Sequence, residues 1–520
     1  MDNAVVNLYG LLMEVKKRMK TPLKLTIEPE RMEACVSEVN IDAFEEQLWE
    51  EITRHRDNVV FVEKKDKETG GLRKVRKDFV LIGYDGDRSA PIHHRLRDFY
   101  SEAKGKELLH DALQDLQTEE SERNHTCVLC GQRFHRHKPK PLTNLKQAIH
   151  PYATKNKALG GVRSDKERKG IRTLVLQENF KDVCPSCYLA GIMAWADESL
   201  IFRSMPDYAF VLLPVSMDFL ALQEIRRNYS NIVITSNRYS SLRVEPLETK
   251  KTSSEDDQVD FPPGPWSMLF GATEKFAQWA VLKLKDGLGE GYEKACNTWL
   301  ALRIPSGTVK DVKSNQLNIE DLPRRTLNIL ITKKTNPYKD FLGQLYVIVE
   351  RGGRSVFDND GLNRKREALS KAFLTNDFNA FAKEFVPRER KRIVLKKEAR
   401  DVLEKLLQEW RLKKMKLEEE HLDILRSAGN LIAETATKSI GLIYRLDRSR
   451  TLPEFWDNLR EISRKMIGLE KPVKSTSLDG VIKLMQAHQK DWEEIKNLLL
   501  IYTCMYYSIK TYTPSKGGEK

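Results

Sequence analysis

Two pairs of cysteines carry the most specific chemistry in this 520-residue sequence. The first pair is Cys127-Val-Leu-Cys130 and the second is Cys184-Pro-Ser-Cys187. A C-x2-C spacing lets two thiolates from one tight turn bind the same ion, and four thiolates complete a tetrahedral zinc site with no position left for water. The sequence therefore predicts a structural Zn²⁺ ion that is bound by these four cysteines.

The residues beside the first pair bear on how the site forms. Gly131 follows Cys130, where such a turn often needs a residue that tolerates positive φ. His135 and His137 are alternative ligands that could replace a thiolate. Four buried, reduced thiols and a disulfide remain open as alternatives to a metal site.

The segment between the two pairs is long and basic. Its 53 residues, 131–183, hold thirteen Lys or Arg against four acidic residues. The whole chain has a formal net charge of +13, so a polyanion is the leading partner, because cations gain affinity by releasing counterions from phosphates. Ordinary basic solubility is the alternative. The candidate nucleic-acid contacts in this segment are Arg163, Lys166, Arg168, Lys169 and Arg172.

A second basic region is predicted to be a β-hairpin. Residues 59–62 and 79–82 form apolar strand patterns on either side of a turn at residues 69–71. Such a ribbon can enter a DNA groove or follow a phosphate backbone. A solvated edge strand protected by lysines is the alternative. The candidate contacts are Arg73, Lys74 and Arg76.

The elements that position these residues predict an α+β chain. Helical periodicity covers residues 5–19, 96–116, 188–196 and 272–285, and strand patterns cover residues 207–219, 231–235, 326–332 and 344–349. We expect a mixed N-terminal body with a zinc-bound insertion, followed by a C-terminal helical bundle. The predicted regions are 1–120 (α+β), 121–200 (zinc-binding, with the basic insertion), 201–360 (continuation of the body) and 361–520 (the bundle).

The last third of the chain is predicted to be almost entirely helical, with four or five helices. One apolar stripe runs from Leu395 to Trp410 and another from Val481 to Tyr502. Just before this region, the sequence from Asp358 to Gly361 begins like a calcium loop, but Leu369 stands where the twelfth-position acid is needed, so a turn or a helix cap is the better interpretation. Basic runs on the bundle supply the candidates Arg390, Lys391, Arg392, Lys413, Lys414 and Lys416.

The cysteine usage and the apolar segments indicate a compartment. Cys35, Cys296 and Cys504 stand alone, which fits a reducing environment where paired thiols bind metal. No signal-peptide pattern and no run of 18 apolar residues is found. We expect a soluble, cytoplasmic protein with no membrane partner.

The order of these parts resembles a known family. Cys127 to Gly131 with Phe134 close behind, then a long basic gap, then Cys-Pro-x-Cys-x-Leu from Cys184 to Leu189, lie in a basic α+β body that precedes a helical third. This layout is similar to the large subunit of type I CRISPR surveillance complexes (Cascade), in the I-A and I-B branch with a four-cysteine zinc motif. The resemblance implies that the four cysteines are the zinc ligands.

The resemblance also implies a function without catalysis. Guide-RNA pairing would read the target, while the protein would recognise a short flanking motif (PAM) on double-stranded DNA and stabilise the R-loop and its displaced strand. The implied partners are guide RNA, target DNA, the backbone and small subunits of Cascade, and a downstream helicase-nuclease or transposition proteins.

Two other functions stay open. HNH nucleases also use two C-x2-C pairs, and His150-Pro151 is faintly of that kind. However, Ala148 and Ile149 occupy the positions before His150 where an acid that binds Mg²⁺ is expected. The other function is a basic scaffold that reads no sequence.

Overall fold

A computed structural model of the full chain describes residues 2–19, 23–35, 40–65, 72–76, 102–127, 130–135, 184–193, 201–204, 208–229, 232–237, 241–246, 264–284, 298–305, 313–319, 336–351, 354–388, 390–412, 417, 419–467 and 475–512. The chain divides into two compact units. The first comprises Met1–Gln258 and Glu293–Asn318, and the second comprises Val259–Tyr292 and Ile319–Lys520. Both combine helices with small antiparallel sheets, so the mixed helix-and-sheet character is confirmed.

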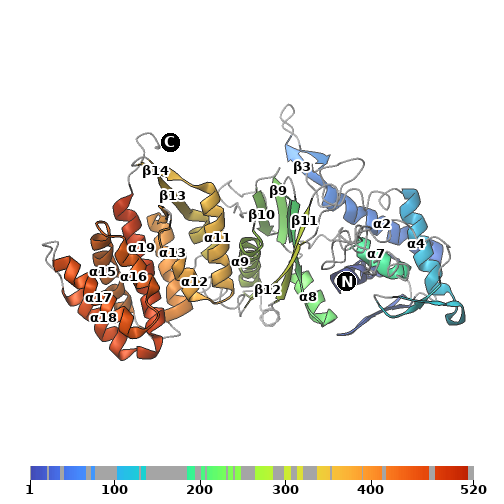
Figure 1. Cartoon of the computed structure of the whole chain (residues 1–520). Helices are drawn as coiled ribbons and strands as arrows, with labels where there is room; N and C mark the ends of the chain where they lie inside the picture. The colour runs from blue at the N-terminus through green and yellow to red at the C-terminus, as the bar shows by residue number, and fades with distance from the viewer. Residues whose placement is uncertain are drawn as a thin grey trace, which may run out of the picture. The chain divides into compact units, whose positions relative to one another are not determined.

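Packed helices form one part of the first unit (Figure 1). In the first helix Leu8, Leu12 and Val15 recur at helical spacing, and all three are buried. This first helix is α1 (Asp2–Met19), and it packs on α2 (Ile41–Val60) and on α7 (Pro185–Met193). Helix α7 also packs on α4 (Glu102–Gln117).

A four-stranded antiparallel sheet of order β12-β11-β8-β7 forms the other part of the first unit (Figure 1). Hydrogen bonds tie helix α1 to this part. Asn3 donates to the carbonyl of Pro214 at 2.8 Å, and Arg226 donates to the Asn3 carbonyl at 3.1 Å. The elements are β7 (Ile201–Ser204), β8 (Tyr208–Pro214), β11 (Thr298–Pro305), β12 (Lys313–Asn318) and α8 (Phe219–Tyr229), which carries Arg226.

Besides the sheet and the short hairpin beside the first cysteine pair, the described part of the first unit contains three further two-stranded hairpins. They pair β1 (Lys24–Ile27) with β2 (Met32–Cys35), β9 (Ile232–Asn237) with β10 (Ser241–Pro246), and β3 (Phe61–Lys65) with β4 (Leu72–Arg76).

The predicted basic hairpin is present, but its strands differ from the prediction. Val59 and Val60 belong to helix α2, because each residue added to an existing helix gains a backbone hydrogen bond and the helix extends past the β-branched pair. The first strand, β3, begins at Phe61, and the second, β4, ends at Arg76, before the predicted strand at residues 79–82. Residues 79–82 lie outside the described residues. In the backbone register of the hairpin, Lys64 lies opposite Arg73 and Glu63 lies opposite Lys74.

The second unit contains the C-terminal bundle (Figure 1). In this bundle α15 (Glu419–Ala436) packs on α19 (Trp492–Thr511), and Gly429 permits their close approach, because a Cβ there would lie 2.8 Å from the Tyr502 Cβ. The described helices outnumber the four or five that were predicted, because short helices such as α12 (Phe378–Lys383) and α16 (Gly441–Arg448) interrupt the apolar pattern. They are α11 (Asn359–Leu374), α12 (Phe378–Lys383), α13 (Lys397–Leu407), α15 (Glu419–Ala436), α16 (Gly441–Arg448), α17 (Leu452–Ile467), α18 (Ser475–Ala487) and α19 (Trp492–Thr511).

A three-stranded antiparallel sheet also belongs to the second unit. Its order is β14-β13-β15, with β13 (Leu345–Arg351), β14 (Arg354–Phe357) and β15 (Lys391–Leu395). Strand β15 lies in the segment that was predicted to be helical, which corrects that prediction. Ile393 and Val394 are β-branched and favour a strand, and pairing with β13 satisfies the backbone.

The cap predicted at Asp358 is confirmed. The Asp358 side chain accepts a hydrogen bond from the Gly361 amide at 3.0 Å at the start of α11. Strand β14 therefore passes directly into a capped helix, and Asp358 needs no calcium ion for its local role.

Two carboxylates, the buried Glu274 and the half-buried Glu367, satisfy the starts of other helical segments in the second unit. Glu367 on α11 accepts from the amides of Trp266 and Ser267, both at 2.9 Å, at the start of α9 (Pro265–Leu284). Glu274 on α9 in turn accepts from the amides of Tyr338 and Lys339, at the start of η6 (Pro337–Phe341). Each carboxylate thereby pairs amides that have no partner within their own helix.

We predict that Glu367→Ala lowers the free energy of unfolding by about 1–3 kcal/mol, because two amides lose their acceptor. Chemical denaturation would measure this loss, with Glu398→Ala at an exposed position as the control. A loss no larger than that of the control would contradict the assigned role.

The pH dependence of the same site follows from its burial. Desolvation raises the pKa of Glu367, so the folded chain holds its proton to higher pH than the unfolded chain does. The stabilisation is present below the unfolded pKa of about 4.3 and is lost as pH rises through the folded pKa. We therefore expect the wild type to lose stability relative to Glu367→Gln as pH rises over that window.

Candidate metal centre

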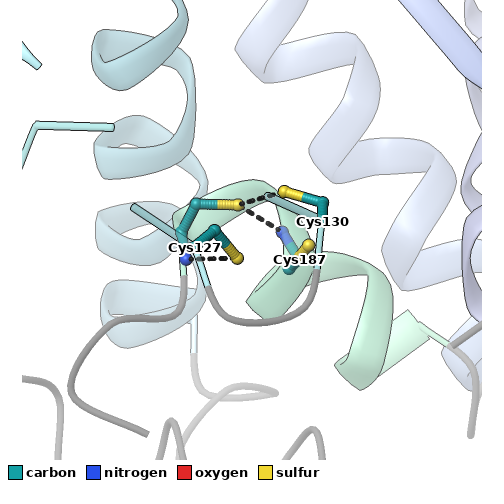
Figure 2. Close-up of side chains that lie close together, drawn as sticks. Cys127, Cys130 and Cys187 are labelled. Atoms are coloured by element: carbon teal, nitrogen blue, oxygen red, sulfur yellow. Dashed lines mark hydrogen bonds between the residues drawn. The ribbon is translucent and has the colours of Figure 1, made fainter. Parts of the chain in front are cut away.

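The structure brings the four predicted ligands together in the first unit. Cys127 follows the short strand β5 (His125–Thr126), and Cys130 lies in the turn that leads to β6 (Arg133–Phe134). Cys184 precedes helix α7, and Cys187 lies in its first turn. All four sulfur atoms lie within 4.8 Å of one another, and Figure 2 shows the labelled side chains gathered between the first turn and the helix.

The distances fit a metal ion better than a disulfide. A tetrahedral zinc ion with Zn–S bonds of about 2.3 Å requires sulfur atoms about 3.8 Å apart. The sulfurs of Cys130 and Cys184 are 3.8 Å apart, whereas a disulfide requires about 2.05 Å. The four cysteines are free thiols, and three of them are buried. This arrangement can hold a metal ion.

Backbone amides orient both cysteine pairs. Gly131 has φ +74°, as its position predicted, and its amide donates to the Cys127 carbonyl at 2.9 Å. The Cys184 amide donates to the Cys127 sulfur, and the Cys187 amide donates to the Cys184 sulfur, each at 3.3 Å. Amides that donate to sulfur favour the thiolate form, which is the form that binds metal.

The electrostatics of the four thiols also favour a cation. The pKa of Cys127 is lowered, because its sulfur accepts hydrogen bonds, from Cys130 first and then from Cys184 and Cys187. The pKa values of Cys184 and Cys187 are raised, first by their hydrogen bonds to Cys127 and also by burial. Thiols this close cannot all ionise by themselves, and a bound cation would remove that obstacle and release their protons.

The surroundings of the site connect it to the helices of the first unit. Helix α7 packs on α1 and α4. On the other side, Asp115 of α4 accepts from the His135 amide at 2.7 Å. An ion held by both cysteine pairs would thus join α7 to a hairpin that is already bound to α4. Asp115 carries no signal in the linear sequence, because its partner lies 20 residues away.

Of the two histidines considered as alternative ligands, only His135 is among the described residues. The His135 ring nitrogen lies 3.0 Å from the Glu122 carbonyl, and His135 is not a member of the sulfur cluster. His137 lies outside the described residues, as does His150 of the HNH alternative.

Most of the predicted nucleic-acid contacts are not described. Arg73, Lys74 and Arg76 lie on strand β4. The other candidates in the basic insertion and the bundle lie outside the described residues: Arg163, Lys166, Arg168, Lys169, Arg172, Lys413, Lys414 and Lys416.

The three candidate contacts at strand β15, Arg390, Lys391 and Arg392, differ in their exposure and in their partners. Arg392 is only 4% exposed, and it donates to Glu350 and to the Thr511 carbonyl, both at 2.6 Å. Lys391 forms an ion pair with Asp358 at 2.8 Å. Arg390 is exposed with φ +62°. Because Arg392 is buried and already hydrogen-bonded, we exclude it from the candidate nucleic-acid contacts. The run of charges in the sequence does not show that one of its members points into the fold.

No family model and no curated protein matches the chain. Among the helices in the described ranges, none is both long and apolar enough to cross a membrane.

We predict that the purified chain binds one zinc ion and that Cys184→Ser abolishes this binding, because three thiolates no longer close the tetrahedron. Elemental analysis would measure the zinc content. Hydrogen exchange should show loss of protection in α7 and the β5–β6 hairpin. Cys35→Ser, at an exposed cysteine, is the matched control, and retention of zinc by Cys184→Ser would contradict the assignment.

Proposed function

We propose that the chain is a non-catalytic, nucleic-acid-binding subunit of an RNA-guided complex, similar in role to the large subunit of type I Cascade. The observation that carries the proposal is the convergence of two C-x2-C pairs at the two ends of a long basic segment. Because the thiols can close a structural zinc site, the metal serves the fold, and the basic segment is left for binding.

The geometry supports a basic loop that is closed at its base. The sulfurs of Cys130 and Cys184 lie 3.8 Å apart, although 53 residues separate the two cysteines in sequence. An excess of nine cations in those residues, thirteen against four, makes phosphates the fitting ligand. The basic hairpin β3–β4 belongs to the same unit and offers a second set of cations.

In the proposed function the guide RNA reads the target by base pairing. The protein recognises a short flanking motif on the DNA duplex, with Arg or Lys side chains aimed at base edges and at neighbouring phosphates. The protein then stabilises the R-loop through contacts to the sugar-phosphate backbone of the nucleic acid, while a helicase-nuclease or transposition proteins act downstream. The structural Zn²⁺ ion keeps the basic loop closed throughout.

Native purification tests this proposal directly. The chain would be purified from its host, and the RNA and proteins that accompany it would be sequenced. Bound RNA of uniform length with repeat-derived ends, together with other subunits, is the expected result. A zinc-bound monomer without RNA would contradict the proposal. Mg²⁺-dependent DNA cleavage that disappears in His150→Ala would favour the HNH alternative instead.

We predict that Arg73→Ala and Lys74→Ala together weaken duplex DNA binding and reduce its salt dependence. Each lost phosphate contact should lower the slope of log K against log salt by about 0.9. Fluorescence anisotropy across a salt series would measure the slope. Lys17→Ala is a suitable control, because Lys17 is exposed and pairs with Glu14. Equal slopes for the wild type and the double variant would show that the hairpin does not contact phosphates.

A further inference from the structure

Two exposed apolar side chains end the strand β14 in the second unit. Phe357 is 60% exposed and Val356 is 44% exposed. Because successive side chains of a strand point to opposite faces, these two residues lie on opposite sides of the sheet. Phe357 pairs with the buried Ile348 on β13, yet most of its own ring is exposed to solvent. An exposed ring of this kind adds little to the stability of the fold and is typical of a binding surface.

A neighbouring ring supports Phe357. Tyr346 lies two residues before Ile348 on β13 and therefore shares its face, and the ring centroids of Tyr346 and Phe357 are 5.6 Å apart at an angle of 51°. The Lys396 ammonium lies 5.4 Å from the Tyr346 centroid, on the ring's face. We call Tyr346, Phe357 and Lys396 the aromatic surface. Figure 1 shows β13 and β14 beside α11 in this unit.

The charges around the aromatic surface favour an anionic ligand. Glu350 and Asp358 are already neutralised by Arg392 and Lys391. By contrast, Lys396, Lys397 and Arg390 are exposed, and no ion pair joins them to another residue that the structure describes. Of the exposed acids in sequence nearby, Asp360 and Glu398 occupy the first turns of α11 and α13, where helix dipoles stabilise them.

We propose that the aromatic surface binds single-stranded nucleic acid, with one base stacked on Phe357 and the flanking phosphates held by Lys396 and Arg390. Unpaired bases expose the flat face that an aromatic ring needs, whereas bases in a duplex are stacked on one another. Exposed rings beside unpaired cations are the combination that such strands bind. This inference deepens the proposed function and rests on it, because it names the strand that the second unit holds.

The conformation of Arg390 fits a binding role. Arg390 has φ +62°, which disfavours side chains other than Gly or Asn. It lies in a tight turn where the Lys391 amide donates to the Arg388 carbonyl at 2.7 Å. Glycine would suit this position better, so Arg390→Gly removes a cation without straining the backbone. That substitution is therefore a clean test of charge.

The experiment uses the full chain and a fluorescein-labelled oligothymidylate of about 20 nucleotides, long enough for one or two strand-binding sites. Phe357→Ala should weaken this binding by about 5- to 150-fold, which corresponds to the loss of one stacked base. Its salt dependence should not change, because no charge is lost. Arg390→Gly and Lys396→Ala should instead lower the salt slope by about 0.7 each.

Two further variants make the test decisive. Phe357→Trp should bind like the wild type, because it keeps a ring. Val356→Ala should also bind like the wild type, because the Val356 side chain is exposed as well but lies on the other face. Wild-type affinity in Phe357→Ala would overturn the inference and would indicate a protein ligand instead. Equal losses in Phe357→Ala and Val356→Ala, or no strand binding by the wild type, would overturn it too.

The outcomes separate this inference from the proposed function. If native purification yields no guide RNA but Phe357→Ala loses strand affinity, the RNA-guided role fails and the aromatic surface stands. If the chain co-purifies with RNA and other subunits but Phe357→Ala binds the oligonucleotide like the wild type, only the aromatic surface fails.

Discussion

The closeness of four thiols is the constraint on which the first unit depends. Cysteines from two distant turns bring their sulfurs within 4.8 Å of one another. Three of them are buried, and such a group is stable only if its members share protons or bind a cation. Because one pair begins helix α7 and the other belongs to a hairpin bound to α4, the same atoms determine how these elements meet.

In the described part of the second unit, carboxylates rather than metal ligands connect neighbouring elements, because they accept hydrogen bonds from the amides at helix starts. Glu367 and Glu274 each accept two amides at the start of another helical segment. Asp358 caps α11 and also pairs with Lys391. Helix starts carry amides without partners, and a buried acceptor from a neighbouring element satisfies them while it fixes the position of that element.

These two architectures suit a division of labour. In the proposed function, a metal ion would close the base of the basic segment without requiring a large apolar core under it, and the cations would be available for phosphates. In the proposed binding mode, the small sheet of the second unit would orient the exposed Phe357 ring before a base stacks on it. Charge then supplies attraction that depends on salt, and stacking supplies affinity that does not.

The sequence alone determined the features that depend on residue type and short spacing. The cysteine pairs, the glycine at positive φ, the cap at Asp358 and the apolar stripes of the bundle were all predictable, because each works through neighbours within a few residues. Only the tertiary structure decided that Arg392 is buried against Glu350 and Thr511, that residues 391–395 form a strand, and that Phe357 stays exposed beside Tyr346. Those properties depend on partners from elsewhere in the chain, and linear periodicity carries no record of which partner a side chain will meet.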